Sequence, residues 1–262
     1  SPDFHTPAAG DRGCFGGCNF CALAFHQGRS VRSRSIEIVV KEAEIIAEMP
    51  DYQTDFEKEL YLHDYVCDNT VYDETTMETT GHTAHSSLLD GRTVCEGYAR
   101  AVQLLLDEVG IENYLIIGEA SDDSGSDLHM WNIVKIDGYY YHLDPTWNDG
   151  AFTDAQGYFY FNVPDTYIMR THSDFNIQNT GCSYNNANYF ERMNTYVKTF
   201  TGFANLTDAA AGVLATGENV VEFVFETKSD YKKMITKLIE VNAILFTKEE
   251  IDFFATSYNK KQ

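Results

Sequence analysis

Three residues whose types can together break an amide bond are spread over the middle of the chain. Cys95 stands at the start of a predicted amphipathic helix that runs to about Val109 and that Gly110 ends. The unpaired amides and the positive dipole end of a helix start favour the thiolate, the nucleophilic form of cysteine. A cysteine in this place is more often a small buried apolar residue, so a nucleophilic role requires a base beside it.

A predicted hairpin brings a histidine and an aspartate together. The Asp-Gly pair at residues 137–138 predicts a two-residue turn, which fixes the pairing of the strands on either side. In that register His129 shares a face with Trp131 and lies diagonally opposite Asp144, roughly 7–8 Å away at the backbone. An imidazole and a carboxylate span this distance, as a base and its orienting group require. The alternative is an exposed histidine and an aspartate that only caps the next turn.

The other cysteines indicate a buried helix position and a metal-binding loop rather than a nucleophile. Cys67 and His63 recur on one stripe of a helix predicted to begin at the capping box Thr54–Glu57 and to end near Asn69, and we interpret both as core residues. Near the start of the chain, a Cys-x3-Cys-x2-Cys spacing lets three thiolates of one loop converge on a metal or an iron–sulfur cluster. These three residues are Cys14, Cys18 and Cys21.

Composition excludes several classes of function. The formal net charge is −21 and the sequence pI is about 4.6, which argues against nucleic acid and against an anionic membrane surface. No apolar run approaches the roughly 20 residues of a membrane span, and residues 1–10 do not resemble a signal peptide. We expect no membrane insertion and no cofactor; oligomeric state and compartment stay open.

The remaining pattern indicates mixed helices and strands. A helix is predicted over residues 35–49, a buried strand over 113–119, an acidic loop over 121–127, a strand over 217–225 and a helix over 229–240. We predict three parts: residues 1–51, a catalytic domain over 52–200, and a small α/β region over 201–262. The first helix carries an expected apolar stripe of Ile36, Val39, Val40, Ala43, Ile46 and Ala47.

Three motifs carry a resemblance to a known family. They are Val94–Ala99 (VCEGYA), His129–Asn132 (HMWN) and Asp144–Trp147 (DPTW). Their order and spacing resemble the core motifs of the transglutaminase-like superfamily. The resemblance implies an α+β fold with a papain-like core, in which the nucleophile helix packs on an antiparallel sheet. It implies Cys95 as nucleophile, His129 as general base and acid, and Asp144 as the orienting carboxylate.

The resemblance implies a protein or peptide substrate and acyl transfer from its amide through a thioester, by a peptidase or a transglutaminase-type enzyme. The Cys95 amide and, as a further hypothesis, Tyr72 would hold the oxyanion; a packed loop aromatic is the alternative for Tyr72. Trp131 and Trp147 are expected to shield the site. A non-catalytic cell-surface or binding module with the same fold is the alternative function. Bacterial relatives of this kind are commonly extracellular, although no export signal is visible here.

The N-terminal cysteine loop resembles a different family, the radical S-adenosylmethionine enzymes, in which three such cysteines hold a [4Fe–4S] cluster. The likeness continues through Arg29 and Ala47, which suggests one bacterial branch of that family. It covers only about the first 50 residues, whereas enclosing such a cofactor takes a barrel of about 200. We interpret residues 1–51 as an incomplete fragment with idle cysteines, and rank an iron–sulfur protein as the less favoured alternative.

Overall fold

The computed structural model describes residues 11–12, 32–33, 35–76, 81–122, 125–149, 157–215 and 221–241. The chain divides into two compact units, residues 1–184 and residues 185–262. The sequence predicted boundaries after residues 51 and 200, and that functional division stays a prediction.

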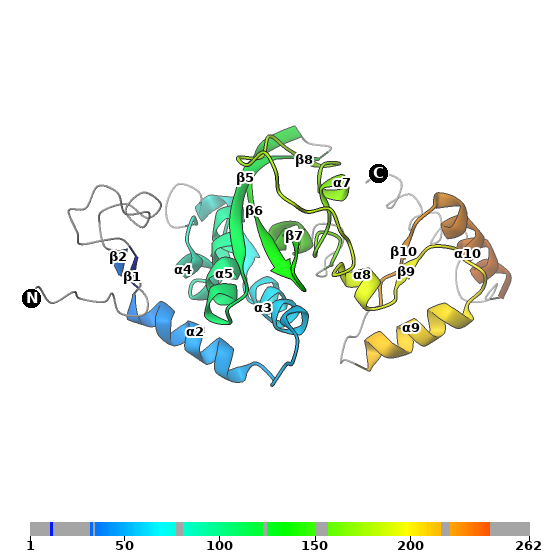
Figure 1. The fold of residues 1–262 in the computed structure, drawn as a ribbon, viewed down its shortest axis with the longest axis horizontal. Helices are drawn as coiled ribbons and strands as arrows, with labels where there is room; N and C mark the ends of the chain where they lie inside the picture. Colours follow the sequence, from blue (N-terminus) through cyan, green and yellow to red (C-terminus); the bar gives the residue numbers. More distant parts are fainter. Residues whose placement is uncertain are drawn as a thin grey trace, which may run out of the picture. The chain divides into compact units, whose positions relative to one another are not determined.

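A four-stranded antiparallel sheet forms the centre of the first unit (Figure 1). Its strands follow the order β7-β6-β5-β8 and the predicted hairpin register holds, since Ile136 pairs with Tyr139. The prediction of a loop over residues 121–127 is wrong for the described residues of that range. They continue strands β5 and β6, and Ser121 pairs with Ser126. The strands are β5 (Asn113–Asp122), β6 (Gly125–Ile136), β7 (Tyr139–Leu143) and β8 (His172–Ser173).

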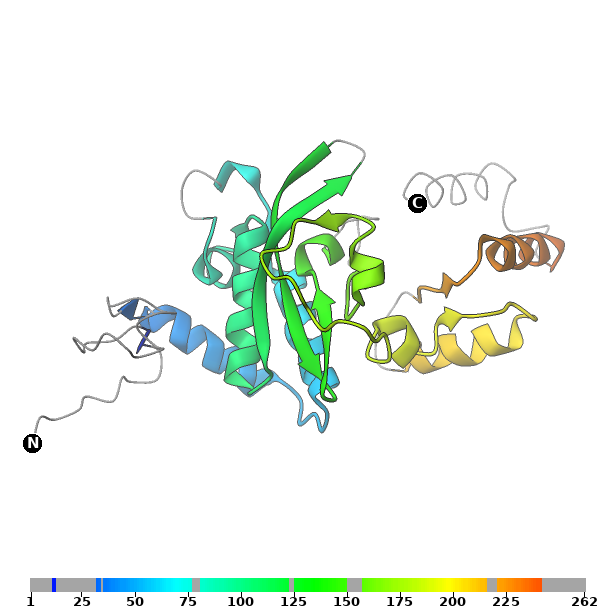
Figure 2. The same ribbon diagram turned by 45° about the horizontal axis from the view of Figure 1, so that its top comes forward.

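Helix α5 (Cys95–Glu108) packs on β5 and β6 of this sheet (Figure 2). It buries Tyr98, Val102 and Leu105, which recur at helical spacing on one stripe of the helix. Helix α3 (Asp55–Asn69) packs against α5 in turn, and the predicted capping box starts it. The predicted α+β arrangement, a helix that begins at Cys95 on an antiparallel sheet, is confirmed.

Helix α2 (Ile36–Glu48) confirms the first predicted helix but not its buried face. The buried residues are Ile38, Glu42 and Ile45, whereas Val39 of the predicted stripe is exposed and Ile36 is 78% exposed. The helix carries apolar side chains on two faces, and its packing against α4 and α5 selects one of them. Periodicity alone could not make that choice.

Short elements complete the first unit. A parallel pair joins β3 to β4, and an antiparallel pair joins β1 to β2. These elements are β1 (Asp11–Arg12), β2 (Arg32–Ser33), β3 (Val71–Tyr72), the 3-10 turn η1 (Glu74–Thr76), α4 (Ala84–Leu88), β4 (Arg92–Thr93), α6 (Pro145–Asn148) and α7 (Asp165–Ile168).

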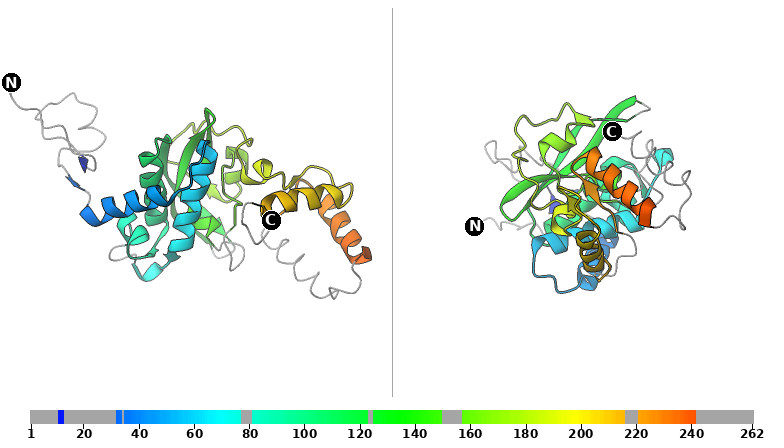
Figure 3. Two further views of the ribbon diagram at one scale, coloured as in Figure 1. Left: turned by 90° about the horizontal axis from the view of Figure 1, so that it is seen from below. Right: turned by 90° about the vertical axis from the view of Figure 1, so that its right-hand side faces the viewer.

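The second unit combines two longer helices with a parallel strand pair (Figure 3, gold to orange). The predicted helix over residues 229–240 is confirmed; among the described residues of 217–225, the strand is limited to two. None of the described helices is both long and apolar enough to cross a bilayer. The elements are α8 (Tyr189–Arg192), β9 (Tyr196–Val197), α9 (Ala204–Leu214), β10 (Val224–Phe225) and α10 (Lys228–Val241).

Candidate active site

The first turn of α5 presents Cys95 in a partly exposed position. Its N-cap residue, Val94, has an extended backbone and supplies no side-chain cap. Gly97 lets this turn approach β4, because a Cβ there would lie 1.8 Å from Thr93 Oγ1. Among the three described cysteines, Cys67 and Cys182 are buried and Cys95 is not. The thiol at the helix start is therefore both accessible and close to amides that no side chain caps.

His129 and Asp144 meet as the hairpin register predicts. His129 lies on β6, and Asp144 directly follows β7, where it caps α6 by accepting from the Trp147 N–H at 3.2 Å through Oδ1. Its other oxygen, Oδ2, lies 2.8 Å from His129 Nε2. Both side chains are buried, so the alternative of an exposed histidine is wrong. Asp144 acts as a cap and as a partner of His129 at once.

The charges at this pair are set by burial and by mutual attraction. Burial alone would lower the pKa of His129, but the charge and hydrogen bond of Asp144, followed by the hydrogen bond and charge of Cys95, raise it to about 10. Burial would raise the pKa of Asp144, yet His129 and then His172 hold it well below its usual range. At neutral pH the pair is an imidazolium and a carboxylate. Because His129 Nε2 donates to Asp144, Nδ1 is the nitrogen left for Cys95.

Tyr72 lies on β3 with its ring stacked on Tyr98, 6.4 Å between centroids. It is 43% exposed. Partial burial of the side chain, followed by the negative charge of Cys95, raises the pKa of Tyr72 to about 12. The phenol is therefore protonated at neutral pH and able to donate a hydrogen bond. Its role as an oxyanion donor stays a prediction.

The two tryptophans enclose the imidazole as expected of shielding residues. The ring of Trp131 stacks on His129 with 5.9 Å between centroids and an interplanar angle of 19°. The ring centroid of Trp147 lies 6.2 Å from that of His129, and the two ring planes are tilted by 56°. Apolar rings exclude water, and a lower local dielectric strengthens the attraction between His129 and its charged partners.

One residue of the site was missed by the sequence reasoning. His172, on the two-residue strand β8, is fully buried with Nε2 3.1 Å from Asp144 Oδ2. It reaches the site because β8 pairs with β5, where His172 faces Ala120. A strand of two residues leaves no periodic signal, so only the folded sheet reveals this contact.

A second cysteine–histidine–aspartate group lies on α3. Cys67 Sγ is 3.7 Å from His63 Nε2, and His63 Nδ1 is 2.9 Å from Asp64 Oδ1. The Asn148 amide donates to the same Nε2 at 3.0 Å, so the lone pair of this nitrogen already accepts a hydrogen bond and is not available to Cys67. Burial raises the pKa of the Cys67 thiol well above its ordinary value. The core role predicted for Cys67 and His63 is confirmed.

Two sets of donors in the described residues are close enough to hold a metal ion: His129, Asp144 and His172, and His142, Asp165 and Cys182. In the second set the Trp131 N–H donates to His142 Nδ1 at 3.0 Å, and His142 Nε2 lies 2.9 Å from Asp165 Oδ1. An indole nitrogen only donates, so His142 Nε2 carries the proton and has no lone pair for a metal. In the first set both imidazoles are engaged by Asp144. Neither set suits a metal, and Cys14, Cys18 and Cys21 lie outside the described residues.

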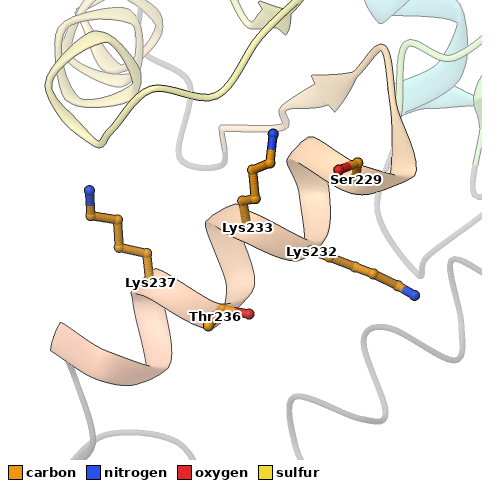
Figure 4. A pocket seen from close by; sticks show the side chains of 5 residues that line it. All are labelled: Ser229, Lys232, Lys233, Thr236 and Lys237. Carbon is orange, nitrogen blue, oxygen red and sulfur yellow. The ribbon is translucent and has the colours of Figure 1, made fainter.

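Cys95 lines neither of two hollows of comparable size. The first, about 430 Å³ on α10, has Lys232 and Lys233 pointing to different sides of the helix, and Lys233 pairs with Asp230 at 3.0 Å (Figure 4). It is a surface of solvated side chains. The second, about 420 Å³, has Asp165 and His172 in its wall. The first hollow is lined by Ser229, Lys232, Lys233, Thr236 and Lys237.

This geometry is that of a thiol–imidazole–carboxylate site on a mixed α+β fold, and the family comparison agrees. Residues 44–145 match the family model described as the transglutaminase-like superfamily. This part of the chain is therefore similar to the transglutaminase-like superfamily, and it includes Cys95, His129 and Asp144.

Solved structures give weaker likenesses. The structure of a TGase aligns over 43% of this chain and 33% of its own, with 15% identity and a TM-score of 0.36. The arylamine N-acetyltransferase NAT3 from Bacillus cereus, whose triad is Cys-His-Glu, aligns over 47% and 53%, with 13% identity and a TM-score of 0.35.

The N-terminal region matches a different kind of protein. A UPF0313 protein of Methanosarcina acetivorans is 60% identical over 42 residues, which are 16% of this chain and 6% of that protein. One from Clostridium botulinum is 45% identical over 53 residues, 20% of this chain and 7% of that protein. The chain thus spans less than a tenth of the curated relatives that it matches. The resemblance of this segment to a larger protein is confirmed, whereas a cluster at its cysteines stays a prediction.

Proposed function

We propose that the protein is a cysteine-dependent enzyme that transfers acyl groups from amide bonds, with Cys95 as nucleophile, His129 as base and acid, and Asp144 as the orienting carboxylate. The observation that carries the proposal is the position of His129, which interacts with Cys95 and bonds the buried Asp144 at 2.8 Å. The transglutaminase-like match over the same residues supports it.

The reaction proceeds in two steps, acylation of Cys95 and release of the acyl group. The Cys95 thiolate attacks the amide carbonyl, the carbon–nitrogen bond breaks, and His129 gives its proton to the departing amine. A thioester remains on Cys95. Water or a second amine then gives a proton to His129 and attacks the thioester, which releases an acid or a new amide. The Cys95 backbone amide and the Tyr72 phenol are the proposed donors to the oxyanion.

Intact-mass spectrometry tests this function. The full chain is incubated with glutamine-containing peptides, with and without an added primary amine. A deamidated peptide identifies a hydrolase, and an amine-linked peptide identifies a transferase. The expected result is turnover that Cys95→Ala abolishes and Cys67→Ala retains. A protein that neither processes any peptide nor forms an adduct on Cys95 would support a non-catalytic binding module instead.

A further inference from the structure

His172 is a second imidazole on the carboxylate of Asp144. Its Nε2 lies 3.1 Å from Oδ2, the same oxygen that bonds His129 Nε2 at 2.8 Å. Because Asp144 is ionised and its oxygens only accept, both imidazoles donate an N–H to it. His172 lies beyond residues 44–145, so the family match does not supply it.

The His172 ring is held from several sides. Its backbone pairs with Ala120 through β8 and β5, and its Nδ1 lies 2.9 Å from the Thr171 hydroxyl. The rings of Trp131 and Trp147 each lie 4.9 Å from it between centroids. A side chain locked in this way keeps its Nε2–H aimed at Asp144 without a further loss of conformational entropy.

Asp144 is fixed by three donors as a result. Trp147 N–H holds Oδ1, while His129 and His172 share Oδ2. Hydrogen bonds to the charged form of a carboxylate keep it ionised, and His172 contributes to the lowered pKa of Asp144 after His129. Without His172, Oδ2 would lose one of its two donors inside a buried site.

We propose that His172 is a positioning residue: its Nε2–H holds Asp144 ionised and turned toward His129, so that His129 stays an imidazolium beside the Cys95 thiolate. This inference rests on the proposed function, because it assigns His172 a part in the same site. His172 does not touch the reacting atoms and acts through Asp144.

The test follows the pH dependence of Cys95 alkylation by iodoacetamide, mapped by mass spectrometry in the full chain. His172→Leu removes the donor, and we expect alkylation at pH 6 to slow about tenfold and the midpoint to rise by about one pH unit. His172→Gln can place an amide N–H near the position of Nε2, so it should restore most of the rate. His63→Gln is the matched control, a buried imidazole with its own carboxylate, and should leave the Cys95 profile unchanged.

Three outcomes would overturn the proposal. They are a folded His172→Leu protein with the wild-type alkylation profile, an equal loss in both His172 variants, and an equal loss in His63→Gln. Should His172→Leu not fold, nitrogen-15 NMR of the wild-type imidazoles decides: the Nε2–H tautomer of His172 is expected, and the Nδ1–H tautomer contradicts the proposal. A wild-type Cys95 that reacts no faster than a free thiol at pH 6 would instead count against the proposed function.

Discussion

The Cys95 group and the Cys67 group contain the same three residue types but differ in what surrounds them. Cys95 begins a helix and is partly exposed, whereas Cys67 sits inside α3 and is buried. His129 keeps Nδ1 for the thiol because Nε2 donates to Asp144. His63 instead accepts from Asn148 on the nitrogen nearest to Cys67. A reactive thiol therefore needs both access and a base whose lone pair is not already engaged.

The third group, Cys182 with His142 and Asp165, supports the same conclusion. Trp131 and Asp165 engage both ring nitrogens of His142. Burial raises the pKa of Cys182 to about 12. The described residues thus contain three such groups, and among these three, hydrogen-bond partners and exposure favour nucleophilic chemistry at the Cys95 group alone.

The largest expected effect is on turnover. Cys95→Ala or His129→Ala should lower amide processing by about 10³-fold or more, because the nucleophile or its base is removed. Cys67→Ala and His63→Gln should keep turnover within a few-fold. Initial rates on a peptide substrate, with circular dichroism to verify folding, measure both. A comparable loss in the Cys67 group would remove the distinction between the groups.

Asp144→Asn tests the carboxylate. The amide keeps the size of the side chain but loses the charge that holds the imidazolium, so turnover should fall by about 10²–10⁴-fold. The nitrogen-15 NMR titration of His129 should show a lower pKa than in the wild type. Asp64→Asn is the matched change in the Cys67 group and should leave the His129 titration in place.

The reactivity of the thiols distinguishes the cysteine groups without a substrate. At neutral pH, iodoacetamide should label Cys95 about 10²-fold faster than Cys67 or Cys182, whose burial and raised pKa disfavour the thiolate. Peptide mapping separates these sites from Cys14, Cys18 and Cys21. Labelling in denaturant should make the rates equal, and equal rates in the native protein would contradict the assignment.

A smaller effect concerns stability against pH. The pKa of His129 rises on folding from 6.5 to about 10, so its stabilising contribution is complete below pH 6.5 and is lost as pH rises toward 10. For Asp144 the pKa falls on folding, so its contribution is present above pH 3.8 and is lost as pH falls further. His129→Gln should remove the alkaline decline, on the order of 5 kcal/mol at about 1.4 kcal/mol per pKa unit. Melting temperatures of both proteins between pH 6 and pH 10 measure it.

Much of the site could be predicted from local sequence patterns alone. The turn at residues 137–138 fixes the hairpin register, and a strand period of two then brings His129 to Asp144. The extent of α5 follows from its apolar spacing, which begins near Cys95, and from Gly110, which ends the helix with a φ of +77°. These inferences are local, since each depends on residues within one helix or one hairpin.

Other features could not be predicted because they depend on contacts between distant segments. The buried face of α2 is chosen by packing against α4 and α5. The ladder that pairs residues 121–122 with residues 125–126 depends on strand pairing rather than on an apolar pattern. The sequence by itself determined which residues begin the helix and share the hairpin. Only the tertiary structure decided which thiol stays exposed, which imidazole keeps a nitrogen for it, and that His172 joins Asp144, because burial and hydrogen-bond partners are properties of the folded assembly of segments.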